Sequence, residues 1–318
     1  MAGCPNNSHC RVRFLYTPPQ MTALSNKSAP AIAPTGFIFL GIMSIGAGIN
    51  WPVQKLLLSE WPPMSARGLS GFAAGFVLAA IALAVRQSIA VPPGMWGRLI
   101  VSAFLNITTW VLMMGFALTI LPASEAAIIA YTSPIWTVLL AAPILHERLT
   151  PIRIIAVVMA FAGIASLLGG SSFDANMAKL PGYLLALATA VTYACGTIFL
   201  KRFPLPMPPL ASASWQLGLG CLPVGLLGLL IERPDVAMLT IVGWSTIAYN
   251  ITIQQCLGYV CWLAALNRLP ASVASIGTMF VPIIGVLASA WALGEPLGPA
   301  QIAALVFTVG SVLLAVRS

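Results

Sequence analysis

Apolar runs dominate this chain and predict its elements. Ten stretches are long enough to cross the ~30 Å hydrocarbon core of a bilayer. They lie at about 35–57, 65–85, 97–120, 124–145, 152–169, 181–200, 210–231, 239–266, 271–293 and 299–316. The connections between them are short and carry turn residues such as Pro92-Pro93-Gly94. The pattern predicts an all-α integral membrane protein of ten transmembrane helices.

Composition supports this interpretation and excludes other classes. Of 318 residues, 59% are hydrophobic and 7% are charged, whereas soluble domains are roughly one quarter charged. The net charge of +8 comes from basic residues scattered at the edges of apolar runs, so no nucleic-acid partner is expected. Neither the cysteines nor the two histidines form a metal-binding pattern, and no metal or cofactor is expected.

The distribution of Lys and Arg predicts the orientation. With the N-terminus inside, eleven basic residues fall in cytoplasmic segments and four fall outside, namely Lys55, Arg67, Lys179 and Arg233. This bias predicts cytoplasmic N- and C-termini in the inner (cytoplasmic) membrane. Residues 1–34 lack the apolar core of a signal peptide and are expected to form a disordered cytoplasmic tail, with Met21 as an alternative start.

An internal repeat organises the ten spans. Leu121-Pro122-Ala123-Ser124 recurs 148 residues later as Leu269-Pro270-Ala271-Ser272. The same shift pairs Trp96 with Trp244, Pro134 with Pro282, Glu147 with Glu295, and Pro151 with Pro299. We therefore predict one repeat at 35–170 (helices 1–5) and a second at 180–316 (helices 6–10). Because five is odd, the second repeat is inverted in the membrane, an arrangement typical of alternating-access transporters with a central site.

Two features indicate where such a site lies. Pro134 and Pro282 are matched prolines inside spans and are expected to kink their helices. Polar side chains inside a bilayer are costly and are expected to face a cavity. The cavity candidates are Asn50, Trp51, Asn106, Thr109, Trp110, Glu125, Thr132, Trp136, Tyr193, Asn250 and Gln254. Asn106 and Gln254 are related by the 148-residue shift.

Alternatives stay open at several of these positions. Glu125 is either a proton or cation site at the cavity mouth or an interfacial carboxylate favoured by the start of its helix. The amides of Asn106, Asn250 and Gln254 are either cavity-lining or interhelical hydrogen-bonding groups. Lys55 and Arg67 are interpreted as anchors whose charged ends reach the membrane surface, with direct contact to the substrate as the alternative.

The motifs resemble those of the drug/metabolite transporter superfamily, specifically its ten-helix members with two EamA domains. The residues that carry the resemblance are Ala123-Ser124-Glu125-Ala126-Ala127, Ser133-Pro134, Glu147-Arg148-Leu149-Thr150 and Gly163 in the first half, and Ala271-Ser272, Pro282 and Gly294-Glu295-Pro296-Leu297 in the second. The resemblance covers residues 35–316. It implies a cavity lined by the first four helices of each half, with helices 5 and 10 peripheral.

The expected function is secondary transport, as an exporter, of small metabolites, amino acids or drugs by alternating access. The partners are a small-molecule substrate and the lipid bilayer, with a proton as the candidate coupling ion. Four-helix multidrug relatives keep a Glu in their first helix, and this chain has none there. A channel or passive facilitator is the alternative. An enzyme is less favoured, because Asp174 and Asp235 lie in loops and no paired acids are available.

Overall fold

The structure of the chain is a computed structural model that describes residues 34–145, 150–169, 173–269 and 277–317. The helices of the first half are α1 (Pro34–Glu60), α2 (Pro63–Ala84), α3 (Trp96–Ala103), η1 (Phe104–Thr108), α4 (Thr109–Ile120), α5 (Ala123–Ala130), α6 (Ser133–Leu145) and α7 (Pro151–Gly169). Those of the second half are α8 (Phe173–Arg202), α9 (Pro209–Ile231), η2 (Val236–Met238), α10 (Ile241–Tyr249), η3 (Asn250–Leu257), α11 (Gly258–Leu266), α13 (Phe280–Leu293) and α14 (Pro299–Arg317).

These helices confirm the predicted helical membrane protein. Six segments of the described chain are apolar and long enough to cross a bilayer, and three shorter apolar helices accompany them. The run α10–η3–α11 corresponds to the eighth predicted span, 239–266. Within the described ranges the chain contains no strand. The predictions for the tail, for Met21 and for Ala271-Ser272 fall outside the described residues.

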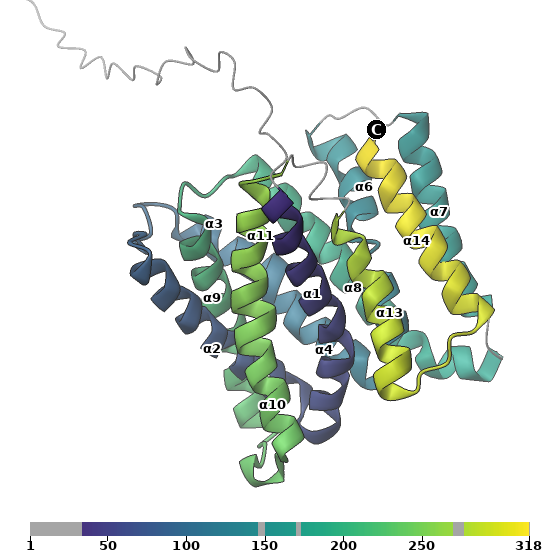
Figure 1. Cartoon of the computed structure of the whole chain (residues 1–318), viewed down its shortest axis with the longest axis horizontal. Coiled ribbons are helices and arrows are strands. Elements are labelled where there is room, and N and C mark those ends of the chain that lie inside the picture. The colour runs from purple at the N-terminus through teal and green to yellow at the C-terminus, as the bar shows by residue number, and fades with distance from the viewer. Residues whose placement is uncertain (1–33, 146–149, 170–172, 270–276, 318) are drawn as a thin grey trace, which may run out of the picture.

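Helix pairing follows the internal repeat. The second helix of each half packs on its counterpart (α2 on α9), and so does the fifth (α7 on α14). Figure 1 shows α7 and α14 side by side at one edge of the bundle. Likewise α1 packs on α13 and α11, while its counterpart α8 packs on α6 and α4. This exchange of equivalent contacts is what two similar halves related by a two-fold axis produce.

The repeated Leu-Pro-Ala-Ser motif shows the same relation. A Cβ on Gly182, near the start of α8, would lie 2.7 Å from Cγ of Leu121. A Cβ on Gly36, near the start of α1, would lie 2.6 Å from Cγ of Leu269. Each leucine therefore packs on a glycine at the start of the other half. Since five spans separate α1 from α8, the two contacts lie at opposite ends of the bundle.

Matched interruptions occur in two spans. The fourth span breaks at Tyr131 and Thr132, between α5 and α6, and the ninth has a turn at Met279, which is 148 residues after Tyr131. Pro134 and Pro282 each follow the break and lie in the first turn of the next helix, where the missing N–H of proline is tolerated. The interruption therefore precedes each proline, whereas the sequence interpretation placed a kink at the proline itself.

A second pair of interruptions consists of wide π turns. The third span contains the π-helical segment Phe104–Thr108, and the eighth contains Asn250–Leu257. Shifting the first by 148 residues places it at 252–256, inside the second. Wide turns of this kind are rare and frequently lie at functional sites. The sequence interpretation did not foresee them.

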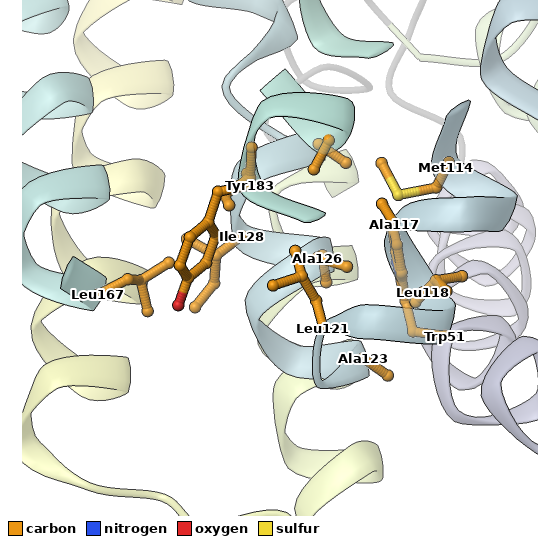
Figure 2. Packing of buried hydrophobic residues seen from close by; sticks show 14 of the residues in the cluster. Trp51, Met114, Ala117, Leu118, Leu121, Ala123, Ala126, Ile128, Leu167 and Tyr183 are labelled. Carbon is orange, nitrogen blue, oxygen red and sulfur yellow. The ribbon is translucent and has the colours of Figure 1, made fainter. Parts of the chain in front are cut away.

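The short helix α5 lies at the centre of the largest hydrophobic cluster. All eight of its residues are buried. Figure 2 shows Trp51 of α1, Met114 and Leu118 of α4, and Tyr183 of α8 packed around it. The small residues of α5 permit this close approach of neighbouring helices. The cluster fixes the position of the break at Tyr131, where the cavity begins.

Candidate functional site

A polar cavity lies between the two halves. Its volume is about 310 Å³, at the lower end of the range for small-molecule sites (about 300–1,000 Å³). Its lining residues come from the first four spans of the first half and the first three of the second: Asn50, Gln54, Arg67, Ser70, Asn106, Ile107, Trp110, Val111, Ala130, Tyr131, Ser133, Tyr193, Leu217, Asn250, Gln254 and Gln255. No residue of α7 or α14 is among them.

A smaller compartment of about 80 Å³ adjoins this cavity. The two spaces share Asn50, Gln54, Arg67, Trp110, Tyr131 and Gln254. The smaller one extends toward Trp51, Met114 and Leu118. Together they make one polar chamber, which we call the central cavity.

Seven of the eleven predicted candidates line the central cavity: Asn50, Trp51, Asn106, Trp110, Tyr193, Asn250 and Gln254. The π turns explain part of this grouping, because η1 carries Asn106 while η3 carries both Asn250 and Gln254. A wide turn changes the direction of the side chains within it relative to a regular α-helix. Polar groups of both halves therefore meet at the central cavity.

The amides of the central cavity are only partly satisfied by the protein. Gln54 Nε2 donates to Asn250 Oδ1 at 2.7 Å, and Asn106 Nδ2 donates to the carbonyl of Ser102 at 3.1 Å. The buried atoms without a partner include Asn50 Oδ1, Gln54 Oε1, Asn250 Nδ2 and Gln254 Oε1. Turning both amides of the Gln54–Asn250 pair would still leave one donor and one acceptor free. Buried polar atoms are rarely left this way without a ligand or water.

Arg67 was interpreted first as an anchor and second as a substrate contact. It is 7% exposed and lines the central cavity, which agrees with the second interpretation. Its Cδ packs closely on Gly115 of α4, where a Cβ built on the glycine would lie 3.3 Å away. Nε and Nη1 are buried and have no hydrogen-bond partner. Among the described residues that line the cavity, Arg67 alone is charged.

Aromatic side chains form part of the wall. The rings of Trp110 and Tyr193 lie 5.3 Å apart between centroids, and those of Trp51 and Tyr131 lie 6.5 Å apart. Both pairs are tilted, as aromatic pairs prefer. They add aromatic surface to a lining that also contains amide groups.

Three predicted candidates are not among the lining residues of the central cavity. The hydroxyl of Thr109 donates to the carbonyl of Leu105 at 2.7 Å. Thr132 is 1% exposed and donates to the carbonyl of Ile129 at 2.6 Å. Trp136 packs edge-on against Phe161 of α7, with ring centroids 5.5 Å apart. The break at Tyr131–Thr132 and the π turn interrupt the regular helical spacing around these residues.

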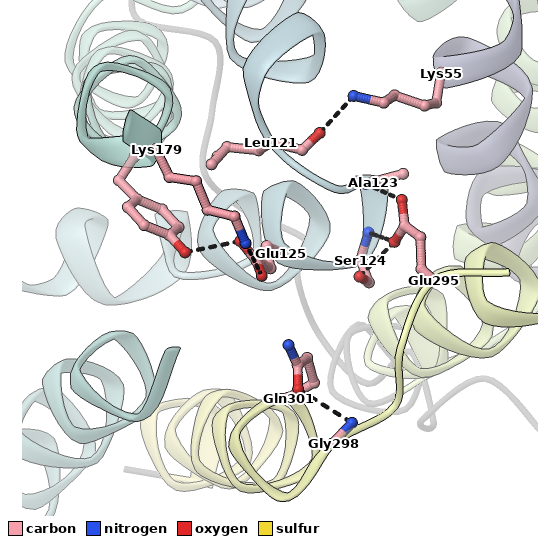
Figure 3. A network of polar contacts seen from close by, with 10 residues as sticks. Lys55, Leu121, Ala123, Ser124, Glu125, Lys179, Glu295, Gly298 and Gln301 are labelled. Atoms are coloured by element: carbon pink, nitrogen blue, oxygen red, sulfur yellow. Dashed lines mark hydrogen bonds and ion pairs between the residues drawn. The ribbon is translucent and has the colours of Figure 1, made fainter. Parts of the chain in front are cut away.

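Glu125 is also absent from the lining. Figure 3 shows it in an ion pair with Lys179, 2.9 Å from Nζ to Oε1. The hydroxyl of Tyr183 donates to its other oxygen at 2.7 Å. Glu125 is 3% exposed. Both of its carboxylate oxygens have partners within the protein. It is therefore not at the cavity mouth, and its contacts are those of a structural carboxylate.

Other charged groups at the same end of the bundle hold helix ends. Glu295 accepts from the backbone N–H groups of Ala123 (2.6 Å) and Ser124 (2.9 Å) at the start of α5. Lys55 donates to the carbonyl of Leu121 at 2.7 Å and to that of Leu118. Figure 3 shows the contacts of Glu295 and the bond from Lys55 to Leu121 beside the Glu125 pair. Lys55 is thus bound to the end of α4 and is not a surface anchor.

Two more glutamates repeat this pattern. Glu232, just after α9, accepts from the N–H groups of Met64 (2.9 Å) and Ser65 (2.8 Å) at the start of α2. Glu60, at the end of α1, accepts from the N–H of Thr240 at 3.0 Å, just before α10. Carboxylates satisfy the unpaired donors of a helix start and favour its dipole. These carboxylates stabilise helix starts. The guanidinium of Arg67, in contrast, has nitrogens without a partner at the cavity.

Comparisons with known proteins agree with this architecture. A model of the EamA-like transporter family matches residues 34–169 and again 180–317. A Bacillus subtilis protein named "Uncharacterized transporter YvbV" is 26% identical over 277 residues, which are 87% of this chain and 90% of that protein. A Salmonella typhimurium protein named "Probable amino-acid metabolite efflux pump" is 27% identical over 305 residues, covering 88% of this chain and 93% of that protein.

A solved crystal structure shares the fold. It matches with a TM-score of 0.62 and 24% sequence identity, covering 87% of this chain and 96% of the other. The two matches of the family model coincide with the two halves whose equivalent contacts were described above.

Proposed function

The chain belongs to the EamA-like transporter family, and on that basis we propose that it is a secondary transporter that exports small metabolites, amino acids or drugs by alternating access. The observation that carries the proposal is the central cavity, which is polar, lies inside a membrane protein and takes its walls from both halves. Inverted halves can exchange conformations, and this exchange would open such a cavity to each side of the membrane in turn.

Counterflow in proteoliposomes tests the mechanism. Vesicles containing the purified protein are loaded with an unlabelled solute and diluted into a trace of the same solute in labelled form. We propose a panel of the twenty L-amino acids and several cationic dyes. A carrier gives a transient accumulation of label, because exchange is faster than net loss. A channel gives only equilibration, and an absence of movement for the whole panel would remove the proposal.

A matched pair of variants connects the movement to the cavity. Val111 lines the central cavity, whereas Val158 on α7 is 62% exposed on the outer face of the bundle. Val111→Trp is expected to reduce counterflow at least tenfold, while Val158→Trp leaves it unchanged. Size-exclusion profiles of both variants check their folding. Equal effects of the two substitutions would contradict a transport route through this cavity.

Export as the direction is supported by relatives named as efflux pumps in Salmonella typhimurium and Escherichia coli. Cells that produce the protein should accumulate less of a transported solute than cells with an empty vector. Higher accumulation would indicate uptake instead.

The orientation and the coupling ion are further parts of the proposal. We place both termini in the cytoplasm and the protein in the inner (cytoplasmic) membrane, and a reporter fused after Ser318 should be active only on the cytoplasmic side. A proton is the proposed coupling ion. No carboxylate is among the described residues that line the cavity. If an imposed pH gradient fails to drive solute transport in vesicles that show counterflow, proton coupling is refuted and the rest of the proposal stands.

A further inference from the structure

We propose that Arg67 binds the carboxylate of the transported solute, so that substrates are small monocarboxylates whose remaining hydrogen-bond donors face the amides of the central cavity. The inference rests on the proposed transport function and names the substrate class for that same cavity. Its observations are the burial of Arg67, the two unpartnered guanidinium nitrogens and the unsatisfied amides around them.

The buried charge of Arg67 carries a free-energy cost. An isolated cation buried away from water is strongly unfavourable unless it is paired. Arg67 is 7% exposed, and Nε and Nη1 have no partner. Elsewhere in the described chain the buried Glu125 has Lys179 as its counter-ion. The described residues that line the cavity include no counter-ion for Arg67, so its neutralising charge is expected to come from the solute.

A carboxylate is the anion that best matches the guanidinium of Arg67. A guanidinium presents a planar fork of N–H donors that matches the two oxygens of a carboxylate. The carboxylate carries one negative charge and cancels the single positive charge of Arg67. A phosphate dianion would leave an excess negative charge, and the described lining contains no second cation to balance it.

The remaining lining residues indicate what else the solute contains. Asn50 Oδ1, Gln54 Oε1 and Gln254 Oε1 are buried acceptors without a partner. All three residues line the same compartment as Arg67. They can accept from an ammonium or hydroxyl group, while Trp110, Tyr131 and Tyr193 offer an apolar wall for a hydrocarbon or aromatic side chain. A solute with one carboxylate, one donor group and an apolar end fits all three surfaces.

Four related compounds separate these contributions. L-Phenylalanine carries both charged groups, 3-phenylpropionate has only the carboxylate, phenethylamine has only the ammonium, and benzylphosphonate replaces the carboxylate. Each competes against labelled L-phenylalanine in counterflow vesicles containing the full chain. We expect phenylalanine and phenylpropionate to compete at least tenfold better than phenethylamine and benzylphosphonate. If phenethylamine or benzylphosphonate competes as well as the carboxylates, the proposal is overturned.

Variants connect this preference to the side chain. Arg67→Gln is expected to lose the advantage of the carboxylates, and Arg67→Lys to retain part of it, because lysine keeps the charge without the planar fork. Arg202→Gln, at the exposed end of α8, is the matched control and should behave as wild type. A carboxylate preference that survives in Arg67→Gln would refute the role of Arg67.

Two safeguards keep the outcomes distinct. If Arg67→Gln fails to fold by size exclusion, the competition series on wild-type protein and Arg67→Lys still decides the proposal. If phenylalanine shows no counterflow, the labelled probe is the panel member that does. Transport of cationic dyes with no inhibition by any carboxylate would refute this inference and leave the proposed transport function standing. No movement of any solute would instead contradict the transport function itself.

Discussion

Two polar regions of this molecule contain buried charge, and they differ in how that charge is satisfied. At one end of the bundle, Glu125 is partnered by Lys179 and Tyr183, and Glu295 by the start of α5. In the central cavity, Arg67 and several amides have atoms without any partner. Burial of charged groups alone would mark both regions as candidate functional sites. The presence or absence of partners separates charges that hold helices together from a charge that is available to a ligand.

The largest expected effect comes from breaking a satisfied pair. Lys179→Met leaves the carboxylate of Glu125, whose side chain is 4% exposed, without its counter-ion. Removing one partner of a buried pair costs about 3 kcal/mol, because the other charge is left uncompensated. We expect a loss of that order in the free energy of unfolding, measured by denaturation with sodium dodecyl sulfate in mixed micelles. The double variant Lys179→Met, Glu125→Gln should recover much of the loss; if it does not, the pair is not the cause.

A smaller loss is expected from the helix-start contacts. Glu295→Gln keeps the shape of the side chain and removes the charge that accepts from Ala123 and Ser124. Loss of a cap of this kind costs about 1–2 kcal/mol. Glu60→Gln is the matched control, because its contact with Thr240 is exposed, and its cost should be under about 0.5 kcal/mol. Equal losses in the two variants would show that burial does not set the value of these caps.

Arg67→Gln should have almost no effect on stability, in contrast to its effect on carboxylate transport. The wild-type guanidinium has no internal partner to lose, and removing an uncompensated buried charge is neutral or stabilising. We expect the free energy of unfolding without solute to change by less than about 0.5 kcal/mol or to rise. A loss as large as that of Lys179→Met would mean that Arg67 is a structural charge, and the contrast between the two regions would disappear.

No effect is expected on the pH dependence of transport when Glu125 is changed. Glu125→Gln should reduce protein yield or stability, yet the pH at which counterflow is half-maximal should stay where it is in wild type. The reason is that Glu125 lies outside the lining of the central cavity. Counterflow measured across a series of external pH values checks this. A displaced profile would give Glu125 a part in coupling.

The sequence predicts the scaffold well because each membrane-spanning helix requires a long apolar segment that is visible in the sequence. Ten apolar runs, the recurrence of Leu121 at Leu269 and the matched prolines Pro134 and Pro282 are all visible without coordinates. Seven of eleven candidate residues also lie at the cavity. They do so because unpaired amides and aromatics inside a bilayer have few alternatives to a cavity or a helix contact.

The positions of other residues depend on geometry that periodicity does not contain. Thr132 and Trp136 lie at and after the break at Tyr131–Thr132, which no periodic pattern in the sequence predicts. Arg67 resembles an anchor because it lies near the start of α2, and its burial depends on the approach of Gly115 from α4. One signal was available: α2 contains no acidic residue that could pair with Arg67.

The two π turns also bear on the history of the chain. The segments Phe104–Thr108 and Asn250–Leu257 coincide when one half is superimposed on the other by sequence number. Acquiring so rare a turn twice at the same register requires two events, whereas inheriting it requires one. A single origin of the turn, before the sequence was duplicated, is therefore the simpler explanation of its presence in both halves.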